Sequence, residues 1–148
     1  INAMSQLHEL LYNQENISYV DAYEYFDALI EELKQSYDND ISINFDIQTQ
    51  LDLDHAVYCG LILNELITNA LKYAFPDNEG DITISLTKKD TLYTLIVKDS
   101  GIGYEQTQST PSLGLTLVDR LAKRQLKGDI DIDPTNGVYI KIQWNSNE

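Results

Sequence analysis

Polar side chains recur at helical spacing in the segment 64–75, which reads NELITNALKYAF. Residues three or four positions apart share one face of an α-helix. The polar residues at that spacing are Glu65, Asn69, Lys72 and Tyr73. They are predicted to project away from an apolar stripe that contains Leu66 and Ile67. A carboxylate, an amide and an ammonium group on one face suit metal-bound phosphates, whereas the alternative is a solvated face with incidental polar residues.

A second polar motif, Asp99-Ser100-Gly101-Ile102-Gly103, follows directly on the apolar run 95–97. A carboxylate at the end of a strand can accept a hydrogen bond from an exocyclic amine of a nucleotide base. Gly101 and Gly103 are expected to let the backbone approach a flat ring and to reach positive φ. Asp and Gly also occur together in ordinary turns, so this motif alone does not identify a site.

A third motif, Ser112-Leu113-Gly114-Leu115, opens a predicted helix. The free backbone N–H groups of a helix start, next to a glycine, form an anion-receptive terminus that suits phosphates. By itself the motif could be only a capped helix. The ordered occurrence of all three motifs, with a polar segment between the second and third, predicts a nucleotide site.

The patterns around these motifs predict one α+β domain. The first helix is expected at about 21–37, with Asp21 as its cap. A second helix is expected to begin at its cap, Asp54, and to run through the first motif, and a third to run from Ser112 to Gly128. Strands are expected at 17–20, 41–47, 81–88, 92–98, 129–133 and 138–144. Strands joined by short turns favour antiparallel pairing. We therefore predict a two-layer α/β sandwich, a mixed, mostly antiparallel sheet that helices cover on one face.

The composition limits the classes of partner. With 24 acidic against 10 basic residues and a net charge of −14, the 148-residue chain is a poor fit to nucleic acid. The charge does not exclude ATP, because a divalent cation, helix N-termini and a few local cations can hold an anionic nucleotide. No apolar run approaches the roughly 20 residues of a membrane span, so we expect no membrane contact.

The histidines and the single cysteine give no transition-metal constellation. Cys59 cannot form an internal disulfide, which fits a reducing, cytoplasmic compartment, and its apolar neighbours predict a packed helix residue. His55, in the first turn of its helix, is expected at the surface.

Taken together, the three motifs resemble those of the ATP-binding catalytic domain of sensor histidine kinases, within the superfamily that includes gyrase and the heat-shock chaperone ATPase. Segment 64–75 is similar to the asparagine box, 99–103 to the first glycine box and 112–118 to the second. The residues 4–12 resemble the end of the dimerisation segment in the subfamily with a Glu-type asparagine box.

The resemblance implies a role for each matching residue in binding Mg-ATP. Asn69 would ligate Mg²⁺ at the phosphates, and Asp99 would receive the adenine amino group. The other implied nucleotide-binding residues are Lys72 and Tyr73 beside the phosphates and ribose, Gly101 and Gly103 in the adenine pocket, and Gly114 and Leu115 at the end of a lid formed by about 104–111. Glu65, one turn before Asn69, is the implied general base.

The resemblance also implies a domain division and partners. Residues 1–14 would be the tail of the dimerisation and phosphoacceptor segment, and 17–148 the catalytic ATP-binding domain. His8 lacks the Arg-Thr-Pro that usually follows an acceptor histidine, and Leu11-Tyr12 resembles a later landmark of the family. We therefore expect the acceptor histidine upstream rather than at His8, and no autophosphorylation by this chain alone. The full-length protein, with or without a membrane anchor, would form a homodimer and phosphorylate a response regulator.

Two other functions stay open. An anti-sigma-type serine kinase has similar nucleotide boxes but phosphorylates a protein serine. A non-catalytic nucleotide-binding regulatory module would have no transferase activity. The helical start that ends His8-Glu9-Leu10-Leu11-Tyr12 favours the histidine kinase over the first.

Overall fold

The structure is a computed structural model that describes residues 19–37, 40–102 and 112–146, with backbone only at 112–114. The helices are α2 (Ala22–Gln35), α3 (Leu53–Asn69) and α4 (Ser112–Arg120), and the π-helical turns η1 (Ala70–Ala74) and η2 (Leu121–Gln125) continue α3 and α4. The strands are β1 (Tyr19–Asp21), β2 (Asp40–Ile47), β3 (Gln50–Asp52), β4 (Glu79–Lys89), β5 (Leu92–Asp99), β6 (Asp129–Asp133) and β7 (Tyr139–Asn145). The expected helical tail at 1–14, Gly103 and the expected lid at 104–111 lie outside the described residues.

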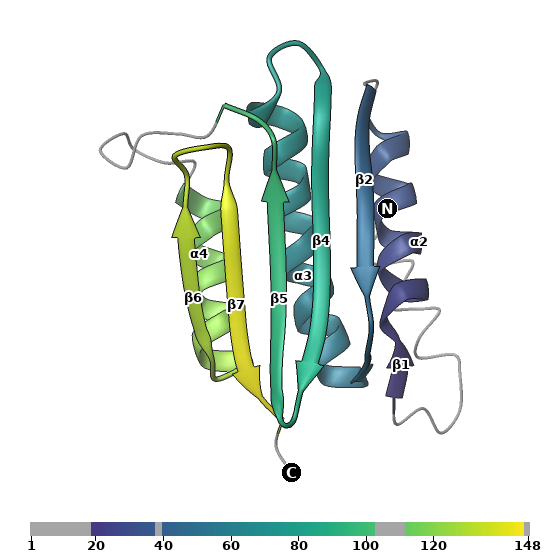
Figure 1. The fold of residues 1–148 in the computed structure, drawn as a ribbon, viewed down its shortest axis with the longest axis vertical. Coiled ribbons are helices and arrows are strands. Elements are labelled where there is room, and N and C mark those ends of the chain that lie inside the picture. Colours follow the sequence, from purple (N-terminus) through teal and green to yellow (C-terminus); the bar gives the residue numbers. More distant parts are fainter. Residues whose placement is uncertain (1–18, 38–39, 103–111, 147–148) are drawn as a thin grey trace.

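Five strands form a mixed sheet in the order β2-β4-β5-β7-β6. Strands β2 and β4 run parallel, and every other neighbouring pair in this sheet is antiparallel. Helices α2, α3 and α4 lie side by side over one face of the sheet (Figure 1). The predicted two-layer α/β sandwich is therefore confirmed.

A small second sheet pairs β1 with β3 in antiparallel register. The sequence predicts a strand at 17–20 but none at 50–52, because a three-residue strand is too short to show alternation. This pairing matters for the start of α3, since Tyr19 lies opposite Asp52, the last residue of β3.

Asp52, rather than Asp54, caps α3, so the predicted cap is wrong. The Asp52 Oδ1 accepts the His55 backbone N–H at 2.8 Å. The reason is that the chain stays extended through Asp52 to complete β3, which puts His55 at the third helical position that a cap side chain reaches. Asp54 is exposed in the first turn.

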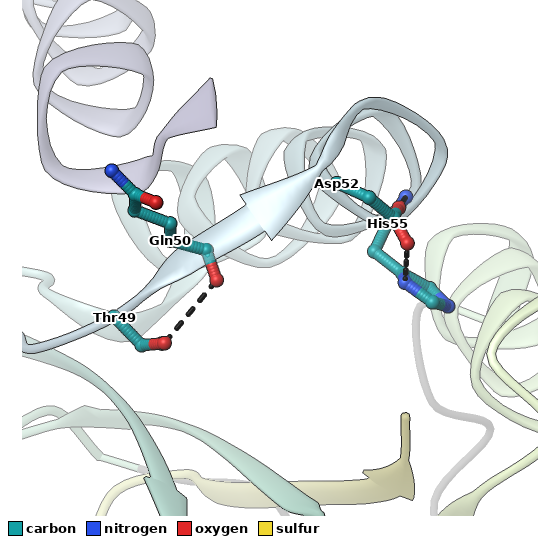
Figure 2. A network of polar contacts seen from close by, with 4 residues as sticks. All are labelled: Thr49, Gln50, Asp52 and His55. Atoms are coloured by element: carbon teal, nitrogen blue, oxygen red, sulfur yellow. Dashed lines mark hydrogen bonds and ion pairs between the residues drawn. The ribbon is translucent and has the colours of Figure 1, made fainter. Parts of the chain in front are cut away.

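The side chain of His55 is buried, contrary to the surface position expected for it. Its Nδ1 lies 2.9 Å from Asp52 Oδ2, as Figure 2 shows. Its ring lies 6.2 Å from that of Trp144, which itself stacks on Tyr93 at 5.3 Å. These four residues form a polar and aromatic cluster where α3 begins.

The core fills the space between the helices and the sheet. Its largest fully buried side chains are Trp144, Phe26, Leu29, Ile30, Leu51, Ile62, Leu63, Ile67, Ile82, Ile84, Leu86 and Leu95. Each such side chain contributes about 1.5–3 kcal/mol of transfer free energy. Cys59 is completely buried as well, and this burial, with a smaller effect of the Asp52 carboxylate, raises the pKa of its thiol. The predicted packing role of Cys59 is confirmed. Within the described residues, no helix combines the length and the apolar character needed to cross a membrane.

The last helix is predicted to stop at Gly128, a residue type that often takes the left-handed conformation after a helix. In the structure Lys127, with φ of 57°, takes this conformation instead. Gly128 is needed for a different reason, because a Cβ there would lie 1.9 Å from the Gln143 carbonyl oxygen on β7.

Candidate functional site

The three sequence motifs lie at one end of the molecule. The C-terminal end of α3 with η1, the end of β5 and the start of α4 are all near the upper edge of the sheet in Figure 1. The turn between β6 and β7 is at the same edge. Contacts join three of these segments directly, since Gly101 approaches Ala74 of η1 and Gly137 approaches Asp99.

Asp99, the last residue of β5, is the buried carboxylate of this site. Only 5% of the residue is exposed. Its Oδ1 accepts two backbone N–H groups, that of Gly101 at 2.9 Å and that of Val138 at 3.1 Å. No hydrogen bond joins Oδ2 to another described residue, so this oxygen can accept a donor from a ligand.

Gly101 lies where the loop after Asp99 packs against η1, the continuation of the helix that carries Asn69. A Cβ at Gly101 would lie 2.3 Å from the Ala74 carbonyl oxygen, which accepts the Ile102 N–H at 3.0 Å. Gly101 does not have positive φ, so this part of the prediction is wrong. The glycine is required here because the backbone of η1 approaches so closely, not because of a left-handed conformation.

Ser100 joins the same motif to the start of β4. Its hydroxyl oxygen accepts the Asp81 N–H at 2.8 Å, and its own N–H donates to the Asp81 carbonyl at 2.9 Å. The motif 99–102 is thus held on two sides, by η1 and by β4.

The polar face of α3 is formed as predicted, with a gradient of exposure along it. Glu65 and Asn69 are half-buried on the last turns of α3, whereas Lys72 and Tyr73 on η1 are exposed, Tyr73 by 59%. The helix changes from α to π immediately after Asn69. Such π-turns are frequent at functional sites, because the wider turn changes where the following side chains project.

Gly114 and Leu115 lie in the first turn of α4, which packs against α3. Leu115 is half-buried and contacts the hydrophobic core. The backbone of this turn can present free N–H groups to an anion.

The residues of this face fit a magnesium ion shared with a ligand. Asn69 offers an amide oxygen, a hard donor of the kind that Mg²⁺ prefers, and the carboxylate of Glu65, one turn earlier, adds negative charge beside it. Among the described residues, no cluster of three or more His, Cys, Asp or Glu side chains could hold a metal on its own. A magnesium ion here would take further ligands from phosphates and water.

Gly137 and Val138 are site residues that the sequence patterns do not predict. Locally, 134–137 reads only as a turn between two predicted strands. The Asn-Gly pair signals such a turn, but which carboxylate the turn meets depends on the pairing of β5 with β7, which no local pattern reveals.

An open hollow of about 550 Å³ lies away from this site, between the small sheet and the β4–β5 hairpin. Its lining consists of Tyr19, Asp21, Tyr23, Ile47, Gln48, Thr49, Gln50, Lys88 and Tyr93. None of the predicted site residues contributes to it.

Residues 55–147 match the family described as histidine kinase-, DNA gyrase B- and HSP90-like ATPase. Because this match spans more than half of the chain, the protein belongs to that family. Residues 1–37 match a second family, described as histidine kinase.

The relatives and structural neighbours carry histidine kinase names. The sensor histidine kinase PdtaS of Mycobacterium tuberculosis is 32% identical over 85 residues, which cover 54% of this chain and 17% of that protein. The histidine kinase domain of the blue-light activated kinase EL346 from Erythrobacter litoralis superposes with a TM-score of 0.79 at 20% identity, covering 97% of this chain and 73% of that chain. The mycobacterial sensor histidine kinase MprB gives 0.68 at 21% identity, with 86% and 95% covered. The match to PdtaS therefore concerns a small part of a longer protein, and the structural likenesses establish the fold.

Proposed function

We propose that this chain is the ATP-binding catalytic domain of a sensor histidine kinase. The observation that carries the proposal is the geometry of Asp99, a buried carboxylate whose Oδ1 accepts two N–H donors and whose Oδ2 accepts none from the other described residues. It lies at the same end of the fold as Asn69 and the start of α4. A base-binding carboxylate, a metal-binding amide and an anion-receptive helix start are the parts that Mg-ATP needs.

In this proposal the site residues divide between the base and the phosphates. Asp99 accepts the adenine amino group, and Gly101 and Gly103 are the residues that would shape the adenine pocket, although Gly103 lies outside the described residues. Asn69 would hold Mg²⁺, and a bound Mg²⁺ would neutralise charge on the phosphates. The remaining contacts to phosphates and ribose come from Lys72, Tyr73, Gly114 and Leu115.

The proposed reaction transfers the γ-phosphoryl group of ATP to a histidine upstream of this chain. A bond forms between an imidazole nitrogen and the γ-phosphorus, while the bond from that phosphorus to the β–γ bridging oxygen breaks and ADP leaves. Glu65, half-buried one turn before Asn69, takes the imidazole proton as general base. Positioning of the two reactants supplies most of the remaining rate enhancement.

The match of residues 1–37 to a histidine kinase family favours a histidine acceptor over a serine acceptor. The proposal keeps the division into an acceptor-segment tail at 1–14 and a catalytic domain at 17–148, while the match to that family extends to residue 37. The proposal includes a cytoplasmic homodimer that passes the phosphoryl group to a response regulator.

The site assignment is tested by titrating ATP against the protein with and without Mg²⁺. Asp99→Ala should weaken ATP binding at least tenfold, about the value of a hydrogen bond to a charged group. Asn69→Ala should remove most of the gain in affinity that Mg²⁺ gives the wild type.

Asn145→Ala is a matched control, because Asn145 is an exposed asparagine at the opposite end of β7. It should leave both affinities unchanged. Undiminished, Mg²⁺-dependent ATP binding by both site variants would refute the assignment.

A further inference from the structure

The turn between β6 and β7 is in direct contact with the backbone of Asp99. Gly137 in this turn has φ of +76°, a conformation that L side chains rarely adopt. A Cβ at Gly137 would lie 2.2 Å from the Asp99 carbonyl oxygen and 3.0 Å from its Oδ1. Only glycine therefore lets the turn come this close to the carboxylate.

The next residue, Val138, uses this close approach to make two hydrogen bonds with Asp99. Its N–H donates to Oδ1 at 3.1 Å, and its carbonyl accepts the Asp99 N–H at 3.0 Å. With the Gly101 N–H at 2.9 Å, two donors from different loops converge on one oxygen. These bonds fix the rotation of the carboxylate and direct the acceptor capacity of Oδ2 to the ligand.

The turn is itself held in place on its other side. Asp133 Oδ1, at the end of β6, accepts the Thr135 hydroxyl at 2.7 Å and the Thr135 N–H at 3.1 Å. The turn that contains Gly137 is therefore held by the Asp133–Thr135 hydrogen bonds as well as by its contact with Asp99.

We propose that Gly137 and Val138 are positioning residues that set base selectivity, by orienting the Asp99 carboxylate so that it accepts from an amino-purine and repels a 6-oxo purine. This inference rests on the proposed function, because it assumes that Asp99 meets the base. An exocyclic amine donates to Oδ2, whereas a carbonyl at the same ring position directs lone pairs at a carboxylate. A carboxylate free to rotate would lose much of this discrimination, since the unfavourable contact could be relieved.

The test compares the affinities for ATP and for inosine triphosphate, which carries a carbonyl in place of the amine. Wild type should prefer ATP by about tenfold or more, the range for a hydrogen bond to a charged group. In Gly137→Ala this ratio should fall to about threefold or less, mainly through weaker ATP binding. A residue with only a fold-stabilising role would lower the two affinities together and leave the ratio unchanged.

Gly128→Ala is the matched control. It also puts a Cβ against the backbone of a neighbouring strand, 1.9 Å from the Gln143 carbonyl oxygen on β7, but at the other end of β6 and away from Asp99. It should lower the melting temperature while keeping the wild-type ratio. If Gly137→Ala does not fold, Val138→Pro removes the N–H donor without a Cβ at position 137 and carries the same expected loss of ratio.

The outcomes separate the two claims. A wild-type protein that does not bind ATP overturns the proposed function and this inference with it. A selective wild type whose ratio survives in Gly137→Ala, or in Val138→Pro, overturns only the positioning role.

Discussion

The Ile102 backbone N–H donates a hydrogen bond of 3.0 Å to the carbonyl oxygen of Ala74. Ala74 is the last residue of η1, the continuation of the helix with Asn69, and Ile102 belongs to the motif that begins at Asp99. This bond joins the side of the candidate site proposed to bind the base to the side proposed to bind the phosphates. The two motifs are thus parts of one structure and should respond together to a change at their contact.

Gly101→Ala should disturb both motifs at once. Its Cβ would lie 2.3 Å from the Ala74 carbonyl oxygen, and because backbone is the obstacle, the end of the helix or the loop must shift. We expect a loss of about 1–3 kcal/mol in the free energy of unfolding and at least a tenfold loss of ATP affinity, measured by denaturation and calorimetry.

Gly60→Ala provides the comparison for Gly101→Ala. Its Cβ would approach the Tyr25 hydroxyl to 2.5 Å in the middle of α3, away from the site. It should lower stability but keep the ATP affinity. Equal ATP affinity in both variants would show that the contact between Gly101 and Ala74 does not shape the site.

Glu65→Gln should separate catalysis from binding. The amide cannot take a proton, so the rate of phosphoryl transfer to an acceptor-containing protein should fall by roughly 10²–10⁴. The dissociation constant for ATP should stay within about twofold, because the side chain keeps its size. Glu31→Gln, the same change at an exposed position of α2, should leave the rate intact. A rate unaffected by Glu65→Gln would remove this residue from the mechanism.

Asp52→Ala should destabilise the fold without touching the nucleotide site. It removes the cap of α3, worth about 0.5–2 kcal/mol, and leaves the buried His55 without its partner. Asp54→Ala, in the same turn but exposed, should cost less than about 1 kcal/mol. ATP affinity should be normal in both, since Asp52 lies at the start of α3 and Asn69 at its other end. Equal losses of stability would contradict the assignment of Asp52 as the cap.

Thr135→Val should change how the turn responds to pH. The Thr135 hydroxyl, and then its N–H, lower the pKa of the Asp133 carboxyl. A lowered folded-state pKa gives stability that is present above the unfolded value of about 3.9 and lost as pH falls through the folded value. In Thr135→Val the titration midpoint of Asp133, followed by NMR, should move to higher pH. The variant should be less stable than the wild type at neutral pH, and this difference should vanish in acid. Thr135→Ser keeps the hydroxyl and should titrate like wild type, whereas an unmoved midpoint in Thr135→Val would rule out the hydroxyl as the cause.

Much of the fold could be predicted because local patterns determine it. Period-two alternation identified β2, and the Asp21 side chain, which accepts the Glu24 N–H at 3.2 Å, capped α2 as expected. The cap of α3 was missed because the pairing of β3 with β1 decides where the chain stops being extended. Asp is a favoured cap residue wherever the helix starts, so propensity alone does not correct the predicted cap from Asp54 to Asp52.

The site shows the same division between local and long-range information. The helical spacing of Glu65 and Asn69 predicted a shared polar face. The burial of His55 depends on Trp144, and the orientation of Asp99 on Val138, which are distant in sequence. Such contacts arise from strand order, so no spacing rule could reveal them.

The central claim is that this domain phosphorylates a histidine. The most direct measurement incubates the full-length protein that contains this sequence with ATP labelled at the γ-phosphate and Mg²⁺, and then follows the stability of the protein-bound label. The account predicts label that is lost in acid and kept in base, as phosphohistidine requires, and that is absent in Asp99→Ala. Label that survives acid, as on serine, or labelling that does not depend on Asp99 would contradict it.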